Sequence, residues 1–345
     1  MKHLFPYRWN IADGYPAKGI VPNGSKVFGT FICGGGSTMG YKLAGYTHIG
    51  GVEIDPEVSE AYKANHAPKY LFTEDIRAFN KRVDLPDELF DLDILDGSPP
   101  CSSFSMAGNR EKDWGKAKVF REGQAHQTLD DLFFDFIALA KRLQPKVEIA
   151  ENVKGMIHGN AKSYVRRIAK EFDEAGYTVQ LFMLNGASMG IPQRRERVFF
   201  VCGRKDMNFP RLTMKFNEPG IPFREIFDPT SEHPQLSASN TRRWHETPLG
   251  ANPTTAKGNT FGYLHRLCDS AVPPTVLSGQ TFLALQDEPR DASEKEYSFM
   301  GSFPQDYNYK SVKPKYLIGM SVPPVMMAQV SHQVNVQWLS RIKDQ

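Results

Sequence analysis

The sequence predicts a doubly wound α/β fold with a mostly parallel sheet, together with a smaller module rich in loops. Strand-like and helix-like segments alternate through residues 26–202, as they do in parallel sheets with helical crossover connections. A glycine cluster, residues 34–36, follows the first of these strands. After residue 202 the periodicity gives way to a stretch rich in Pro, Asn, Thr and Gly. We therefore expect one sheet-based domain with a distinct module inserted after it.

The apolar patterns place the individual elements in order along the chain. Alternating or continuous apolar stretches predict strands at residues 26–33, 46–53, 69–72, 89–95, 146–150, 178–184 and 197–202. Helical spacing predicts a helix from the glycine cluster to residue 43, and further helices over residues 56–65, 129–143 and 163–175. Periodic segments return at residues 290–303, and a Pro-Pro pair starts a last helix over residues 325–341.

These patterns divide the chain into four parts. Residues 1–25 are rich in turn formers and predict an N-terminal extension lying on the surface. Residues 26–202 form the main domain, and residues 203–265 form the loop-rich module. Residues 266–345 are expected to return to the main domain.

Composition excludes several classes of protein. The 345 residues contain no apolar run long enough to cross a membrane, and the N-terminus lacks the apolar core of a signal peptide. The four cysteines are far apart and form neither a zinc signature nor a disulfide framework. We therefore expect a cytoplasmic protein without a bound metal. A net charge of +3 does not by itself indicate a nucleic-acid partner.

Cys101 is the first candidate for chemistry. It follows the strand over residues 89–95 and the turn-forming residues Gly97, Pro99 and Pro100. Ligands of open α/β sheets bind at the carboxyl ends of the strands. A thiol held there is a candidate nucleophile, although a free cysteine is as often a small buried apolar residue.

Acidic residues at the ends of the second and third predicted strands indicate a nucleotide-like ligand. The glycine cluster can cradle such a ligand, and Glu53, about 20 residues further on, can accept hydrogen bonds from ribose hydroxyls. Asp75 ends the third strand, where it can reach the amine of an adenine. The pattern fits NAD, FAD and S-adenosylmethionine equally, and tight turns with a surface acid are the alternative interpretation.

Two more motifs belong to the same edge of the predicted sheet. Glu151 follows the strand over residues 146–150, and Arg195 and Arg197 alternate where the last strand begins. Two guanidinium groups there can hold a carbonyl oxygen and favour a thiolate. A helix cap for Glu151 and a solvated basic run for the arginines are the alternatives.

Together these motifs resemble those of the DNA cytosine-5 methyltransferases, in the order found in that family and over nearly the whole chain. The resemblance is carried by Phe31-Ile-Cys-Gly-Gly-Gly, Glu53-Ile-Asp55, Asp75-Ile76, Pro100-Cys101, Glu151-Asn152-Val153 and Gln193-x-Arg195-x-Arg197. Residues 266–275, Phe303-Pro304 and residues 319–324 match its later motifs. Two positions depart from the family pattern. Cys33 stands where a glycine is common, and Met320 replaces the usual asparagine, so Ser321 is expected to take over part of that contact.

The resemblance implies a Rossmann-like methyltransferase fold, with residues 26–202 as catalytic and cofactor-binding domain and residues 203–265 as target-recognition domain. It implies methyl transfer from S-adenosylmethionine to C5 of a flipped-out cytosine in a short specific sequence of double-stranded DNA. Cys101 would attack C6, Glu151 would bind N3 and the exocyclic amine, and Arg197, helped by Arg195, would hold O2. The implied cofactor residues are Phe31, Gly34, Gly35, Gly36, Glu53, Ile54, Asp75, Ile76, Leu132 and Ser321.

Basic residues in two segments indicate where DNA would bind. Residues 102–127 are expected to close over the flipped base, and residues 203–265 to read the major groove. The candidate contacts are Ser103, Arg110, Lys112, Arg121, Arg242 and Arg243. We expect the protein to be a monomer. A cognate restriction endonuclease of the same restriction-modification system is the expected partner protein, without a stable complex between the two. Methylation of transfer RNA, a catalytically silent DNA-binding subunit and a nicotinamide-dependent oxidoreductase are the competing hypotheses.

Overall fold

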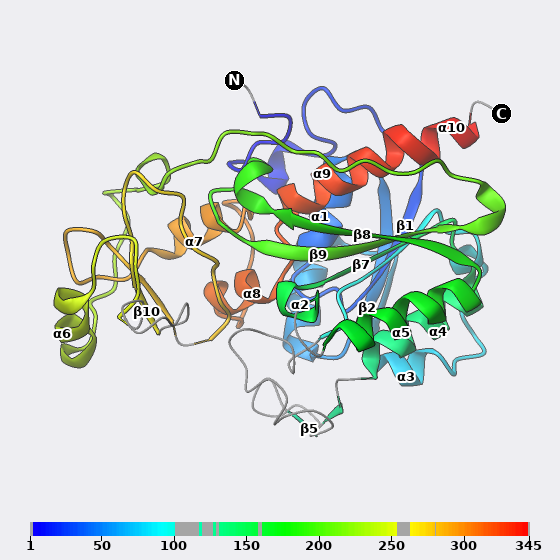
Figure 1. The fold of residues 1–345 in the computed structure, drawn as a ribbon, viewed down its shortest axis with the longest axis horizontal. Coiled ribbons are helices and arrows are strands. Elements are labelled where there is room, and N and C mark those ends of the chain that lie inside the picture. The colour runs from blue at the N-terminus through cyan, green and yellow to red at the C-terminus, as the bar shows by residue number, and fades with distance from the viewer. Residues whose placement is uncertain are drawn as a thin grey trace.

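A seven-stranded sheet with helices on both faces forms the larger part of the molecule (Figure 1). The computed structural model describes residues 3–100, 117–118, 127–128, 131–157, 161–253, 263–279 and 281–343. The strand order is β3-β2-β1-β4-β7-β9-β8. The predicted α/β fold with a mostly parallel sheet is confirmed.

The strands occupy most of the predicted segments. They are β1 (Lys26–Thr30), β2 (Thr47–Glu53), β3 (Tyr70–Thr73), β4 (Ile94–Gly97), β7 (Val147–Val153), β8 (Tyr177–Asn185) and β9 (Glu196–Arg204). The ladder from β3 to β7 is parallel, whereas β9 runs antiparallel to both β7 and β8. Because β1, β2, β4 and β7 are parallel, their carboxyl ends meet at one edge of the sheet.

Alternate strand residues face two separate apolar layers. Val27 and Ile149 pack in one layer, which also contains residues of α1 (Gly36–Leu43), α2 (Pro56–His66) and α9 (Pro324–Val334). Phe28 and Ala150 pack in the other, with residues of α3 (Ile76–Phe79), α4 (Leu132–Leu143) and α5 (Ala161–Glu174). This alternation is the period-two pattern of a sheet buried on both faces.

Two strand predictions were misplaced along the chain. Residues Asp87–Phe90 form a 3-10 turn, and the strand β4 is Ile94–Gly97, so Gly97 continues the strand instead of ending it. The reason is that β1 and β7 both pair with residues 94–97. Likewise, Glu151 does not follow its strand but lies within β7, because β9 pairs with β7 as far as Val153.

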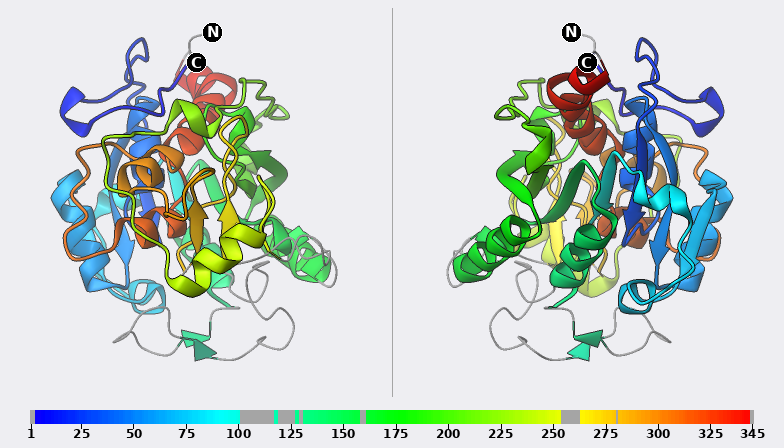
Figure 2. Two further views of the ribbon diagram at one scale, coloured as in Figure 1. Left: turned by 90° about the vertical axis from the view of Figure 1, so that its left-hand side faces the viewer. Right: turned by 90° about the vertical axis from the view of Figure 1, so that its right-hand side faces the viewer.

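A smaller lobe lies to one side of the sheet (Figure 1) and faces the viewer in the left view of Figure 2. It contains α6 (Ala238–Glu246) and the parallel pair β10 (Leu264–Arg266) and β11 (Phe282–Ala284), which share a small apolar cluster around Trp244. The domain boundary predicted after residue 265 falls inside β10, and the four-part division of the chain stays a prediction. The two-residue strands β5 (Ala117–Lys118) and β6 (Gln127–Thr128) pair separately.

The last part of the chain returns to the sheet. Helices α7 (Glu294–Met300) and α8 (Pro314–Met320) lie between the smaller lobe and the sheet, and α9 packs along α1 (Figure 1). After α9 the helix passes through a π-helical turn, Asn335–Leu339, into α10 (Ser340–Lys343). The N-terminal segment is irregular as predicted, but it is not only a surface extension, since Phe5 and Trp9 are buried in the same layer as α9.

Candidate active site

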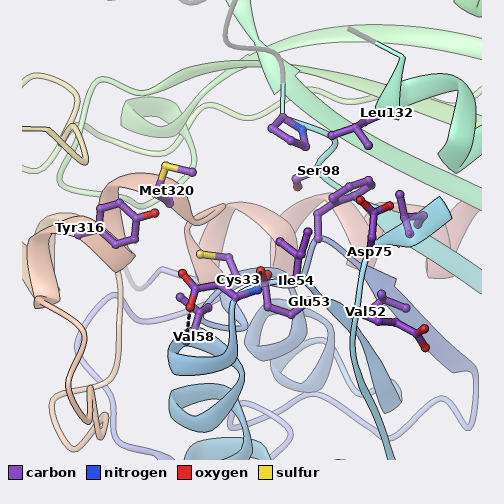
Figure 3. Close-up of a pocket in the computed structure, with 15 residues that line it drawn as sticks. Cys33, Val52, Glu53, Ile54, Val58, Asp75, Ser98, Leu132, Tyr316 and Met320 are labelled. Carbon is purple, nitrogen blue, oxygen red and sulfur yellow. Dashed lines mark hydrogen bonds between the residues drawn. The ribbon is translucent and has the colours of Figure 1, made fainter. Parts of the chain in front are cut away.

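A pocket lies at the edge where the parallel strands end (Figure 3). Tyr316 and Met320 of α8 stand on one side of it, and Asp75 and Leu132 on the other. Six of the ten predicted cofactor residues line this pocket: Phe31, Glu53, Ile54, Asp75, Ile76 and Leu132. Among the described residues, the predicted residues Gly34, Gly35, Gly36 and Ser321 do not line it.

Glu53 is placed by β2 and held by two main-chain groups. Its carboxyl accepts hydrogen bonds from the N–H of Cys33 (2.8 Å) and of Asp55 (3.0 Å). Burial raises the pKa of Glu53, and these two hydrogen bonds work in the opposite direction. A carboxylate has about four acceptor positions, so roughly two remain for hydroxyl groups of a ligand.

The loop after β1 reaches the pocket through an uncommon backbone conformation. Phe31 and Cys33 have φ values of 53° and 47°, and such positive values are costly for residues with a side chain. Both residues line the pocket. Burial raises the pKa of the Cys33 thiol to about 12, with a further contribution from Glu53. The Cys33 thiol is therefore neutral at ordinary pH and makes an apolar part of the wall.

The glycine cluster is explained by packing within the protein. Gly35 has φ +76° at the start of α1. A Cβ atom on Gly36 would lie 2.0 Å from the main-chain oxygen of Val322, and one on Gly34 would lie 2.1 Å from Leu317. These glycines let α1 and the loop before it approach α8 and the segment that follows. Their contribution to the pocket is indirect, because they let α8, which carries the lining residue Met320, pack against the loop after β1.

Asp75 and Asp55 each begin a helix next to the pocket. Asp75 caps α3 by accepting from the N–H of Arg77 at 2.7 Å, and Asp55 caps α2 by accepting from Glu57 and Val58. Cys33, Asp55 and Met320 stand in the family motifs but were not among the predicted cofactor residues, and Glu74 and Tyr316 were not singled out at all; all five line the pocket, and at the last motif it is Met320 and not Ser321 that does so. Tyr316 and Met320 are four residues apart on one helix, so their shared face was a usable signal.

The loop to Cys101 starts at the wall of this pocket. Ser98 and Pro100, which follow β4, are lining residues. Asn152 of β7 donates to the main-chain oxygen of Pro99 at 3.0 Å and so holds this turn against the next strand. Cys101 itself lies outside the described residues, as do the predicted DNA contacts Ser103, Arg110, Lys112 and Arg121.

Glu151 and Arg197 form a buried ion pair at the same edge of the sheet. Arg197 Nε lies 2.8 Å from Glu151 Oε1, and the two side chains are only 12% and 10% exposed. Their adjacency follows from the antiparallel pairing of β7 with β9. Burial lowers the pKa of Arg197, while Glu151 counteracts this effect.

Arg195 points elsewhere. Its Nη1 donates to the main-chain oxygen of Val276 (3.1 Å), and its Nη2 donates to those of Gly319 and Ser321 (both 3.0 Å). The expectation that Arg195 helps Arg197 to hold a base oxygen therefore does not match these contacts. The main-chain oxygens of Val276, Gly319 and Ser321 already occupy its terminal nitrogens.

A buried carboxyl that the sequence analysis passed over lies on β4. Asp96 accepts from the hydroxyl of Tyr41 at 3.0 Å. Burial, with a smaller contribution from the charge of Glu151, raises the pKa of Asp96 to about 7, although the hydrogen bond from Tyr41 acts in the opposite direction. Asp96 thus adds a second titratable group near the Glu151–Arg197 pair.

The fold and site are those of an α/β enzyme with a pocket at the carboxyl ends of parallel strands, which is where such enzymes bind their ligands. The family model of C-5 cytosine-specific DNA methylases matches residues 26–335. The chain belongs to that family.

Similar proteins agree with this assignment. Type II methyltransferase M.FnuDI of Fusobacterium nucleatum is 38% identical over 191 residues, which are 55% of this chain and 50% of the relative. M1.HphI of Haemophilus parahaemolyticus is 25% identical over 337 residues, covering 88% of this chain and 85% of the relative. The alignments with M.FnuDI and with M.NgoPII of Neisseria gonorrhoeae span only about half of those relatives, 50% and 52%.

Solved structures show the same fold. A prophage-encoded E. coli protein, described as a candidate DNA modification methyltransferase, has a TM-score of 0.70 at 16% identity, over 91% of this chain and 99% of its own. S. pombe Dnmt2 methyltransferase has a TM-score of 0.61 at 15% identity, over 92% and 99%. Within the described residues, no helix is long and apolar enough to cross a membrane, and no group of three His, Cys, Asp or Glu could hold a metal ion.

Proposed function

We propose that this protein transfers a methyl group from S-adenosylmethionine to C5 of a flipped-out cytosine, in a specific short sequence of double-stranded DNA. The observation that carries the proposal is that a pocket, the start of the loop to Cys101 and a buried ion pair all lie at one edge of the sheet. A pocket suited to an adenosine shares its wall with Ser98 and Pro100, which lead directly to Cys101. The Glu151–Arg197 ion pair belongs to the same edge. Family membership supports the same reaction.

The residues of the pocket fit the proposed cofactor. Glu53 retains acceptor positions for the ribose hydroxyls. Asp75 offers a carboxylate to the adenine amine, and Phe31, Ile76 and Leu132 provide apolar contacts for the ring. Bound S-adenosylmethionine would supply the methyl group as an electrophile on sulfur. Cys33 and Met320 line the pocket farther from Asp75 and Leu132, and they would contact the amino-acid part of the cofactor.

Cys101 is proposed as the nucleophile, since C5 of cytosine does not react unaided. Its thiolate would form a bond to C6, and the electrons of the C5–C6 double bond would make C5 nucleophilic. Once C5 carries the methyl group and S-adenosylhomocysteine is left behind, transfer of the C5 proton to water would restore the double bond and release the thiolate from C6.

Glu151 and Arg197 are proposed to hold the base during this addition. Negative charge develops on the ring when the thiolate adds, and it spreads to O2 and N3. The Arg197 guanidinium would donate to O2, and the carboxyl of Glu151 would share a proton with N3. Their 2.8 Å contact fixes both groups before the base arrives, so that little reorganisation is needed during the reaction.

Contacts to DNA are proposed from helix α6 of the smaller lobe. Arg242 and Arg243 are exposed on α6 in the smaller lobe, where Arg243 also donates to Asn240 at 3.4 Å. A base inside a duplex is out of reach of Cys101, so the cytosine would have to leave the stack. We propose that the protein acts as a monomer, and that a restriction endonuclease of the same system is not needed for transfer.

The direct test is methyl transfer with labelled S-adenosylmethionine and the purified protein alone. Unmethylated duplex DNA and transfer RNA serve as the two substrates in parallel reactions. We expect label in 5-methylcytosine of the duplex and none in the transfer RNA. Label confined to transfer RNA would contradict the proposed substrate.

A further inference from the structure

Residues Gln193, Arg194 and Arg195 join three parts of the chain that are far apart in sequence. The N–H of Arg194 donates to the main-chain oxygen of Pro273 (2.8 Å), and its own oxygen accepts from Thr275. The side chain of Gln193 donates to the main-chain oxygen of Met300 (2.8 Å) and accepts from the N–H of Val276 (2.9 Å). This segment leads directly into β9, which begins at Glu196.

Arg195 extends this junction to the pocket. Its Nη2 binds the main-chain oxygens of both Gly319 and Ser321, at 3.0 Å each. The residue between these two, Met320, lines the pocket. One guanidinium therefore holds the main chain on both sides of a pocket residue.

The position is also favourable for a cation. Gly319 belongs to the last turn of α8, where carbonyl groups lack partners within the helix. A positive charge near such a terminus is stabilised by the helix dipole. The carbonyl of Val276 completes the set and ties α8 to the segment that connects β10 and β11.

The burial of Arg195 is costly and needs a reason. The residue is 2% exposed, and Nε has no hydrogen-bond partner among the described residues. Burial lowers the pKa of Arg195, the neighbouring Arg197 lowers it further, and Glu151 acts in the opposite direction. Apolar side chains of similar volume often replace buried charges without loss of stability. The arrangement is better explained by placement of main chain than by stability.

We propose that Arg195 is a positioning residue that fixes the wall of the pocket formed by Met320, and ties this wall to the strand that carries Arg197. The inference rests on the proposed function, in which this wall contacts the amino-acid part of S-adenosylmethionine. It assigns Arg195 no contact with the base. Arg197 alone then serves the O2 of the cytosine.

The test compares two ligands that differ only in the part facing Met320. S-adenosylhomocysteine contains the amino-acid part, and 5′-methylthioadenosine lacks it. Dissociation constants are measured by calorimetry for the wild type, Arg195→Met and Arg195→Lys. Arg194→Met is the matched control, because Arg194 is the adjacent arginine and its side chain is exposed. Circular dichroism checks the fold of each variant.

We expect Arg195→Met to weaken S-adenosylhomocysteine at least tenfold, while 5′-methylthioadenosine changes less than twofold. The affinity of Arg195→Lys for S-adenosylhomocysteine should fall between those of the wild type and Arg195→Met, because an ammonium group can reach fewer of the three carbonyls. If Arg195→Met does not fold, Arg195→Lys carries the same comparison. Unchanged affinity for S-adenosylhomocysteine, or equal losses for both ligands, would overturn the inference. A wild type that binds neither ligand would instead refute the proposed function.

Discussion

Glu148 allows a quantitative prediction about stability. It is the second residue of β7, and its side chain is fully buried. The nearby Tyr177 hydroxyl moderates the effect of burial on this carboxyl, but it donates its proton to the main-chain oxygen of Pro145 at 2.8 Å, so neither carboxyl oxygen has a hydrogen-bond partner of good geometry among the described residues. It faces Cys202 across the pairing of β7 with β9. Burial raises the pKa of Glu148 well above its ordinary value.

The sign of the pH effect follows from this raised pKa. Between the unfolded and folded pKa values, the folded protein holds a proton on Glu148 that the unfolded chain has lost. The native state then binds more protons, so the free energy of unfolding falls as pH rises through this window. One proton corresponds to about 1.4 kcal/mol per pH unit. The contribution is intact below the unfolded pKa, near 4.3 for a glutamate, and is lost as pH rises toward the folded value.

Glu148→Gln removes this titration and keeps the shape of the neutral carboxyl group. We expect the variant to gain stability relative to the wild type from pH 5 to pH 8, by about 1.4 kcal/mol for each pH unit within the window. Urea denaturation at several pH values, followed by circular dichroism, measures the difference. Other buried acids such as Glu53 and Asp96 titrate in both proteins, so their contributions cancel in the difference between the two unfolding free energies. A difference that stays constant from pH 5 to pH 8 would refute the reasoning.

Two further predictions concern ligands. Glu53→Ala should raise the dissociation constant of S-adenosylhomocysteine by about 10- to 150-fold, since a net loss of one hydrogen bond to a charged acceptor is worth roughly 1.5–3 kcal/mol; unchanged affinity in calorimetry would rule out the ribose contact. Replacing Arg242 and Arg243 together by glutamine should weaken duplex binding and reduce the slope of log K against log salt by about 2, as expected for two lost phosphate contacts. An unaltered slope in fluorescence anisotropy would exclude phosphate contacts by this helix.

Local patterns in the sequence predicted the sheet and much of its edge. Each strand carries its own apolar pattern, and the acids at strand ends need only local information to be found. Glu53 and Asp75 accordingly line the pocket. Leu132, which the family resemblance indicated, lines it as well.

Features that depend on distant pairing were missed. The position of Glu151 inside β7 requires β9 to run antiparallel beside it, and nothing within residues 146–153 indicates that partner. The lining residue Met320 lies on α8, which together with the segment that follows it packs closely against Gly34 and Gly36, far earlier in the chain. The contacts of Arg195 with the carbonyls of residues 276, 319 and 321 are equally non-local. Spacing alone could place Arg195 near Arg197 but could not show where its side chain points.

The central claim is that Cys101 carries out methylation of cytosine in duplex DNA. Bisulfite sequencing of DNA from cells that express the wild type or Cys101→Ser tests it most directly. We predict that the wild type produces 5-methylcytosine at one position of one short sequence, and that Cys101→Ser leaves the same sites unmethylated. Methylation by Cys101→Ser at the level of the wild type would contradict the account, as would the absence of methylated cytosine in cells that contain the folded wild type.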